Sequence, residues 1–287
     1  IVLQRGAMVH RSDNDNLLIG DFQLPTNRAL IMGVINVTPD SFSGDGFHRS
    51  PNDAIAQAHQ LVLDGADIID VGGESTRPGA KPISAEEEMN RVLPIIEIAA
   101  QQLEVPLSID TSKADVAAHC IAAGASMVND IKGLQDQEML DVIQGTGIAL
   151  TLMHMRGTPE TMAVQNSYGD LISEIKSYLL AQAEKAIAAG AQTVVIDPGL
   201  GFAKDTAQNL MILNNLRSFV DSGYPVLVGP SRKRFIGELT GAKPNNRVPG
   251  TIAAVIKCVE FGVAIVRVHD VAACKQAIAV NEAINKA

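Results

Sequence analysis

Eight short aliphatic runs recur along this chain, and a polar stretch and a longer amphipathic segment follow each of them. Short runs rich in Val and Ile, bounded by polar or glycine residues, are typical of strands buried on both faces. The segments between them have helical spacing, with Ile55, Ala58, Leu61 and Val62 on one face of residues 53–64. The predicted strands are residues 29–34, 68–71, 106–109, 126–128, 148–152, 193–196, 225–228 and 264–268.

This alternation predicts an α/β fold, a (β/α)8 TIM barrel of eight parallel strands and their following helices. A length of 287 residues fits one barrel, which typically runs to about 250 residues, better than two domains. We therefore predict a single barrel domain at residues 29–287 behind a short leader at residues 1–28. Within the leader, residues 17–24 are predicted to form a hairpin over the barrel bottom. An open doubly wound sheet is the alternative that the same alternation allows.

Composition narrows the class of protein further. A net charge of −9 disfavours a general nucleic-acid binder, which needs a basic face. No apolar run reaches the roughly 18–20 residues of a membrane span, and the N-terminal residues lack a signal-peptide pattern. The three cysteines, Cys120, Cys258 and Cys274, show no paired spacing and indicate free thiols. We expect a cytoplasmic protein with neither a nucleic-acid nor a membrane partner.

Polar residues follow the end of every predicted strand. Because barrel strands end at one common rim, these side chains are expected to share a single site. The longest connections, residues 36–51, 72–84, 153–167 and 229–246, also follow strands and would form loops over that rim. The polar strand-end residues are Asn36, Glu74, Ser75, Thr76, Arg77, Asp110, Asn129, Asp130, His154, Asp197, Ser231, Arg232, Lys233, Arg267 and His269.

The chemistry of these residues divides the rim into two sides. Asp110, Asn129 and Asp197 can accept or exchange hydrogen bonds with the N–H-rich edge of a polar heterocycle. A second group presents donors and positive charge, and it comprises Arg77, Lys233, Arg267 and His269. Phosphate sites in barrels commonly lie after the seventh and eighth strands, where most of this group stands. The sequence thus predicts a heterocycle on one side and an anion such as pyrophosphate on the other.

The strand-end segments also form long motifs that resemble those of the dihydropteroate synthase family of pterin-binding barrels. The resemblance covers most of the chain, from about Ile31 to His269, with the motifs in the family's order. They are residues 33–43 (GVINVTPDSFS), 70–79 (DVGGESTRPG), 109–112 (IDTS), 129–131 (NDI), 153–155 (MHM), 197–199 (DPG), 201–202 (GF), 231–233 (SRK) and 267–270 (RVHD).

The resemblance implies a transferase of folate biosynthesis. Such an enzyme joins 6-hydroxymethyl-7,8-dihydropterin diphosphate to p-aminobenzoate and releases pyrophosphate with the help of Mg²⁺, and sulfonamides inhibit it. The small-molecule partners that the resemblance implies are therefore these two substrates and the sulfonamides. Loss of pyrophosphate before attack by the amine is the expected order, because an aryl amine is a poor nucleophile.

Residue by residue, the resemblance implies a role for each matching position. Asp110, Lys233 and Arg267 would be catalytic. The implied pterin ligands are Asp110, Asn129, Asp197 and Lys233, and the implied diphosphate ligands are Asn36, Arg77, Arg267 and His269. Asn36 would also lie next to the metal. Pro78, Phe202 and the Lys233 stem would flank p-aminobenzoate, and Thr76 and Ser231 complete the substrate-binding set.

The chain departs from the family pattern in three places. Residues 43–46 read Ser-Gly-Asp-Gly where Asp-Gly-Gly is more usual, Pro230 precedes Ser231, and Ala203 stands where glycine is common. None of these changes removes a named side chain. Two alternatives stay open: a methyltetrahydrofolate-type pterin methyltransferase, which would not need the anion-binding group, and a non-catalytic pterin-binding paralogue.

The predicted helix at residues 248–261 is apolar on more than one side, where it carries Ile252, Val255, Ile256 and Val259. One apolar face would suffice to pack a helix against the barrel. The additional face predicts a second burial surface, and we expect a homodimer formed through the C-terminal helices.

Overall fold

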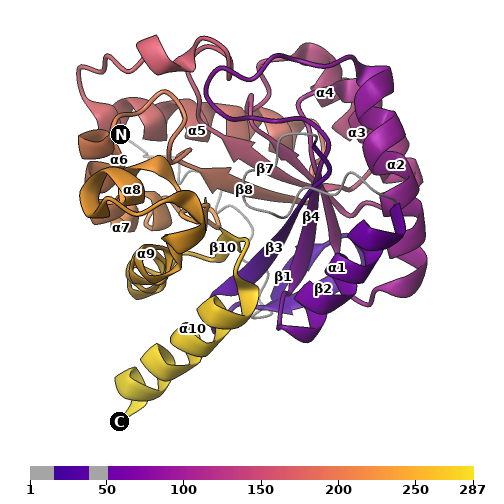
Figure 1. Cartoon of the computed structure of the whole chain (residues 1–287). Coiled ribbons are helices and arrows are strands. Elements are labelled where there is room, and N and C mark those ends of the chain that lie inside the picture. Colours follow the sequence, from indigo (N-terminus) through magenta and orange to yellow (C-terminus); the bar gives the residue numbers. More distant parts are fainter. Residues whose placement is uncertain (1–15, 39–50) are drawn as a thin grey trace, which may run out of the picture.

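Eight parallel strands form the centre of the molecule, and helices surround them (Figure 1). The computed structural model describes residues 16–38 and 51–287. The strands are hydrogen-bonded in the order β8-β7-β6-β5-β4-β3-β10-β9, and a parallel bridge between Ile196 and Val226 joins the two outer strands. Ile196 N also donates to Pro225 O at 3.0 Å, so the sheet closes on itself. The (β/α)8 barrel is confirmed, and the open doubly wound alternative is wrong.

Each barrel strand begins and ends within two residues of its predicted range. The barrel strands are β3 (Leu30–Asn36), β4 (Ile68–Gly72), β5 (Leu107–Asp110), β6 (Met127–Asp130), β7 (Ala149–Met153), β8 (Thr193–Asp197), β9 (Leu227–Val228) and β10 (Ile265–Val268). The helices are α1 (Pro51–Leu63), α2 (Ala85–Gln102), α3 (Ala114–Ala122), α4 (Gln137–Ile143), α5 (Leu171–Ala188), α6 (Thr206–Asn214), α7 (Leu216–Val220), α8 (Arg234–Thr240), α9 (Val248–Glu260) and α10 (Val271–Lys286), with 3-10 turns η1 (Met162–Val164) and η2 (Pro244–Asn246).

An apolar cluster fills the N-terminal end of the barrel. Because strand side chains alternate between two faces, every second residue points inward. The inward residues at this end are Leu30, Met32, Ile68, Met127, Ala149, Val195, Leu227 and Ile265. Leu17 and Ile19 join them from an antiparallel hairpin of β1 (Asn16–Ile19) and β2 (Phe22–Pro25). The hairpin therefore covers the barrel bottom, and a ligand site must lie at the opposite end.

Towards that opposite end the inward positions become polar. Two residues beyond members of the apolar cluster, on the same strands, stand Asp70, Asn129, Thr151, Asp197 and Arg267. Asp70 and Thr151 are completely buried. The barrel thus changes from an apolar floor to a polar interior before it reaches its C-terminal rim.

Two stretches of the sequence predictions lie outside the described residues. Residues 1–15 hold the first half of the predicted leader, and residues 39–50 hold the end of the first motif together with the unusual residues 43–46. Among the described helices, none combines the length and the apolar character that crossing a membrane requires.

Candidate active site

A cavity of about 450 Å³ lies at the C-terminal rim of the barrel. Every residue that was assigned to substrate or metal from the sequence lines it: Asn36, Thr76, Arg77, Pro78, Asp110, Asn129, Asp197, Phe202, Ser231, Lys233, Arg267 and His269. They come from seven different strand ends or from the connections that follow them. Glu74, Ser75 and Arg232 line the same cavity, whereas Asp130 and His154 are not among its lining residues.

An ion-pair network lies at the centre of this cavity. The Arg267 guanidinium donates from Nε to Asp70 Oδ2 at 2.6 Å and from Nη2 to Asp110 Oδ2 at 2.7 Å. Although burial disfavours the charged form, these two carboxylates raise the pKa of Arg267. Burial raises the pKa of Asp110 to about 7, against the opposing charge of Arg267. Arg267 therefore stays protonated and holds two carboxylates side by side.

The two carboxylates keep one oxygen each for another partner. Asp70 Oδ1 and Asp110 Oδ1 are buried, and neither has a hydrogen-bond partner among the described residues. Asn129 Nδ2 donates to Asp70 Oδ2 at 3.4 Å, which leaves the Asn129 amide oxygen as a further acceptor. Buried acceptors of this kind are normally satisfied. A ligand or a water molecule with N–H or O–H donors would satisfy these.

Asp197 ends β8 on another side of the same space. Gly199 N donates to Asp197 Oδ1 at 2.7 Å, so Oδ2 is the oxygen available to a ligand. Burial raises the pKa of Asp197 to about 6, while the Gly199 hydrogen bond and the charge of Lys233 act in the opposite direction. Asp197 is therefore mostly ionised at neutral pH and accepts hydrogen bonds.

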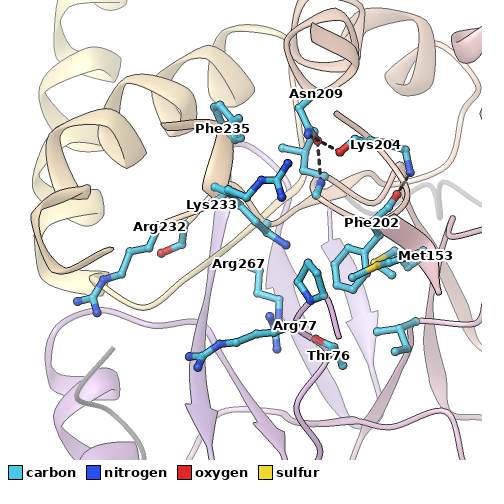
Figure 2. Close-up of a pocket in the computed structure, with 18 of the residues that line it drawn as sticks. Thr76, Arg77, Met153, Phe202, Lys204, Asn209, Arg232, Lys233, Phe235 and Arg267 are labelled. Atoms are coloured by element: carbon cyan, nitrogen blue, oxygen red, sulfur yellow. Dashed lines mark hydrogen bonds between the residues drawn. The ribbon is translucent and has the colours of Figure 1, made fainter. Parts of the chain in front are cut away.

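Lys233 follows β9 and occupies the N-cap position of α8. Its Nζ lies 4.5 Å from the centre of the Phe202 ring, a cation–π distance. Burial lowers its pKa to about 8, and Asp197 opposes this shift. Figure 2 shows Lys233, Arg267, Phe202 and Thr76 around one space. A flat ligand there would lie between an aromatic wall and cationic side chains.

On the side of the rim that was predicted to bind an anion, His269 is not the cation that the sequence indicated. Burial lowers the pKa of His269 to about 3, so the imidazole is neutral and brings no positive charge. Its Nδ1 lies 2.9 Å from Ser231 Oγ and its Nε2 lies 3.4 Å from Asn36 Nδ2. Within the predicted anion-binding group, the positive charge comes instead from Arg77, Lys233 and Arg267, and His269 acts as a hydrogen-bonding group.

Several rim residues hold the connections in place. Asp270 accepts from Arg232 Nε at 2.9 Å and from Nη2 at 2.6 Å, and Asp130 accepts the backbone amides of Lys132 and Leu134. Asp130 and Asp270 thus act as structural partners. Lys113 Nζ donates to Glu74 Oε2 at 2.7 Å and to Glu88 Oε2 at 2.5 Å, which fastens the connection after β4 to α2. That connection carries Thr76, Arg77 and Pro78.

Sequence reasoning missed three residues of this region. Asp70 lies inside a motif and shares the inward parity of Ile68, so strand alternation alone identifies it as an interior group. Lys204 and Arg247 also line the cavity. Lys204 donates to His154 O and Arg247 donates to Arg232 O, both far away in the sequence, and no local sequence signal marks such bonds.

The donor set suits Mg²⁺ only in combination with a substrate. Within residues 16–38 and 51–287, no group of three or more His, Cys, Asp or Glu side chains could hold a metal ion. Asn36 Nδ2 lies beside His269, which leaves Asn36 Oδ1 for a cation. Mg²⁺ commonly binds one or two protein oxygens together with substrate phosphates and water. Asn36 fits this mode of binding.

Comparison with known proteins gives consistent matches over this whole region. The family described as "Pterin binding enzyme" matches residues 32–269. A dihydropteroate synthase of Synechocystis sp. is 46% identical over 261 residues, which cover 90% of each chain. The structure of Yersinia pestis dihydropteroate synthase with a sulfonamide drug complex is 40% identical, with a TM-score of 0.91, over 95% of this chain and 100% of that one. The structure of Xanthomonas albilineans dihydropteroate synthase with 4-aminobenzoic acid is 42% identical, with a TM-score of 0.86, over 92% and 96% of the two chains.

Proposed function

The chain belongs to the pterin-binding enzyme family, among the dihydropteroate synthases, and we propose how the cavity at its C-terminal rim carries out the reaction. The site joins 6-hydroxymethyl-7,8-dihydropterin diphosphate to p-aminobenzoate and releases 7,8-dihydropteroate and pyrophosphate, a step of folate biosynthesis. The relatives are transferases of this kind, which favours the synthase over a pterin methyltransferase or a non-catalytic paralogue.

One observation carries the assignment of the pterin subsite. Three strand ends bring the acceptors of Asp110, Asn129 and Asp197 into one buried space, together with the Lys233 ammonium. The edge of a pterin offers ring and amino N–H donors beside ring nitrogen and carbonyl acceptors. Carboxylates can receive the donors, and Lys233 can donate to the acceptors. The partnerless Asp110 Oδ1 supports this assignment.

The reacting carbon is the exocyclic methylene of the pterin. Its bond to the diphosphate oxygen breaks with the electron pair leaving on pyrophosphate, and the electron-rich dihydropterin ring stabilises the resulting cation. Asp110 would stabilise that cation as well. Arg267 and Arg77 would stabilise the leaving group with charge-assisted hydrogen bonds, to which His269 adds a neutral one. The amine nitrogen then forms the new C–N bond and releases a proton, and no strong base is needed.

Phe202, Pro78 and the stem of Lys233 would flank the benzoate ring. All three line the cavity next to the pterin space. The Xanthomonas albilineans relative was solved with 4-aminobenzoic acid and the Yersinia pestis relative with a sulfonamide drug complex. We extend both ligand classes to this chain, with Thr76 and Ser231 as further contacts.

Mg²⁺ would neutralise charge on the diphosphate when it is bound. Asn36 Oδ1 would be its protein ligand, and the phosphate oxygens and water would complete the shell. Asn36 stands at the end of β3, in register with Gly72 of β4. This position lets the amide approach the diphosphate side of the cavity.

We also propose that the protein is a homodimer through α9 and α10. A mainly apolar groove between these helices is lined by Ile252, Ile256, Ala273, Ala277, Val280 and Ile284, with polar Gln276 and Asn281. Val280 is 56% exposed and Ile284 is 67% exposed, and α10 projects from the body of the molecule (Figure 1). A second copy would cover these side chains.

Two further assignments remain proposals. Cys120, Cys258 and Cys274 are free and buried, which suits a reducing cytoplasm. Residues 1–28 are proposed as a leader to the barrel at residues 29–287, with the hairpin of β1 and β2 at its end.

The reaction itself tests the proposal. The protein is mixed with 6-hydroxymethyl-7,8-dihydropterin diphosphate, p-aminobenzoate and Mg²⁺, and both pyrophosphate and dihydropteroate are measured. We expect the two products in equal amounts, with dihydropteroate dependent on p-aminobenzoate. Failure of folded protein to form dihydropteroate would refute the proposed function.

A further inference from the structure

The turn that carries Phe202 has an unusual backbone. Gly199, Gly201 and Ala203 all have positive φ angles, of 72°, 81° and 51°. Glycine adopts such angles readily, but an alanine in this conformation costs on the order of 1 kcal/mol. A turn that contains a strained alanine holds its shape only when the surrounding structure fixes it. The position of the Phe202 ring therefore depends on what fastens this turn.

Lys204 provides the most extensive of these fastenings. Its side chain is buried, and its Nζ lies 2.8 Å from Phe202 O, 3.1 Å from His154 Nδ1 and 3.2 Å from His154 O. An ammonium has three N–H donors and no acceptor, so these three contacts use all of its donors. The contacts join the turn after β8 to the end of β7. Figure 2 shows the Lys204 bond to Phe202 beside the cavity.

Two other side chains hold the same turn. Tyr168 OH donates to Ala203 O at 3.1 Å. Asn209 accepts Gly201 N at 2.7 Å and donates to Lys204 O at 3.3 Å. The backbone of each residue from Gly201 to Lys204 therefore forms a hydrogen bond to a side chain. That side chain is Lys204 for Phe202, and Asn209 or Tyr168 for the other three residues. The turn is a fixed wall of the cavity.

The Lys204 ammonium is an expensive choice for a purely structural link. Its hydrogen-bond partners are two carbonyl oxygens and an imidazole, and none of them is a carboxylate. Burial lowers its pKa to about 7; Asp197 on β8 opposes this shift, and Lys233 after β9 and Arg156 after β7 add to it. Burial also lowers the pKa of His154 to about 3, so this neighbour remains a neutral acceptor. Buried charges are usually paired, and a neutral residue would be less costly here.

We propose that Lys204 is a positioning residue for the p-aminobenzoate subsite: its ammonium fixes the turn that presents Phe202 to the benzoate ring. This inference rests on the proposed function of the site. Three of the four pterin ligands do not depend on the same link, because Asp110 and Asn129 stand on β5 and β6, and Asp197 is held in the barrel ladder by its pairing with Met153. The fourth, Lys233, lies over the Phe202 ring but is held separately, at the start of α8. Lys204 thus governs one substrate more than the other.

The test separates the two substrates by their KM values. Lys204→Met keeps most of the stem and removes the ammonium, and Lys185→Met on the exposed face of α5 is the matched control. The loss of hydrogen bonds from a charged group predicts a rise of about tenfold in the KM for p-aminobenzoate and less than about twofold in the KM for the pterin diphosphate. The control should match the unchanged protein. Equal rises in both KM values, or a lower Tm with unchanged KM values, would overturn the inference.

A pH profile adds a readout that a merely structural role would not move. As the pH rises from about 6 to about 8.5, Lys204 loses its proton, so the KM of the unchanged protein for p-aminobenzoate should rise. Lys204→Met should lack that part of the rise, whereas the contribution of Lys233 is common to both proteins. Profiles that differ only by a constant factor would count against Lys204.

If Lys204→Met does not fold, the role of Lys204 is tested with the pH profile of the unchanged protein and with a second variant. Tyr168→Phe removes the bond to Ala203 O and should raise the KM for p-aminobenzoate in the same selective way, by about threefold for one neutral hydrogen bond. The inference is overturned if Tyr168→Phe raises both KM values equally and the KM of the unchanged protein for p-aminobenzoate does not change with pH. Complete lack of dihydropteroate formation by the unchanged protein speaks against the proposed function instead.

Discussion

Asp197→Asn should weaken pterin binding and at the same time stabilise the ligand-free protein. The substitution keeps the shape of the side chain at the end of β8. The amide oxygen can keep the hydrogen bond from Gly199 N, so the NH2 group replaces the Oδ2 acceptor that faces the ligand. A pterin N–H would then meet a donor instead of a carboxylate oxygen.

The size of the binding loss follows from the chemistry of that contact. A hydrogen bond to a charged group contributes roughly 1.5–3 kcal/mol, which corresponds to about a tenfold to 150-fold change in Kd. The carboxylate must be ionised to accept, so pterin binding by the unchanged protein should weaken as the pH falls through about 6, the pKa of Asp197. The Asp197→Asn variant has no titrating group at this position, and its Kd should lack this dependence.

The stability effect has the opposite sign. The pKa of Asp197 rises from 3.8 in its ordinary state to about 6 in the fold, so folding favours the protonated carboxyl. Its stabilising contribution is fully present below pH 3.8 and is lost as the pH rises through about 6. At a pH of about 7.5 the ionised group therefore lowers the free energy of unfolding by up to roughly 3 kcal/mol relative to a neutral side chain of the same shape. Asp197→Asn should recover part of this difference at about pH 7.5 and none of it at about pH 3.5.

Two measurements check this reasoning. Isothermal titration with a non-reactive pterin at several pH values gives the Kd. Denaturant unfolding gives the stability at about pH 7.5 and at about pH 5, where a smaller part of the difference is expected. Asp136→Asn is a suitable control, because it changes the helix cap at the start of α4, which does not line the cavity. Two results would show that Asp197 does not act as described. One is a Kd of the variant within about threefold of that of the unchanged protein. The other is a gain in stability over the unchanged protein that is smaller at about pH 7.5 than at about pH 5.

Three further predictions concern other parts of the protein. Arg267→Ala should lower the free energy of unfolding by roughly 3–5 kcal/mol, because Asp70 and Asp110 lose their buried counter-ion, and it should weaken pyrophosphate binding more than pterin binding in calorimetry; equal losses would remove its anion role. Asn36→Ala should raise the Mg²⁺ concentration needed for half-maximal activity in a metal titration, and an unchanged titration would exclude Asn36 as a metal ligand. If the proposed dimer forms through α9 and α10, Ile284→Glu should convert it to a monomer in light scattering at micromolar concentration, because a charge would enter the apolar groove; a dimeric mass of the variant would place the interface elsewhere.

The sequence predicted the barrel well because strand formation in a barrel is a local matter. Each strand is a short aliphatic run whose inward and outward residues follow from the period of two. The predicted strand at residues 225–228 is observed as β9 over two residues only. The other two predicted residues, Pro225 and Val226, form the hydrogen bond and the bridge that close the barrel. The rim could be predicted for the same reason, since barrel strands all end on one side.

The electrostatics of the site could not be predicted in the same way. His269 reads as a source of positive charge in the sequence, but its burial among cations keeps it neutral. Lys204 reads as an ordinary lysine before a helix, yet it is buried and bonded to His154, fifty residues earlier in the chain. Both properties arise from which distant groups surround a side chain. No run of neighbouring residues contains that information.

The interior of the barrel shows why binding and stability oppose each other at this site. Asp70 Oδ1, Ser108 Oγ, Asp110 Oδ1 and Thr151 Oγ1 are buried, and none has a partner among the described residues. A buried polar group without a partner costs about 1–3 kcal/mol, and apolar side chains in these positions would give a more stable barrel. The polar interior is useful only when donors and acceptors from outside, either substrate or ordered water, complete it. Pterin binding should therefore stabilise the fold, because the ligand supplies donors to these buried acceptors. The same logic predicts that Asp197→Asn stabilises the empty protein.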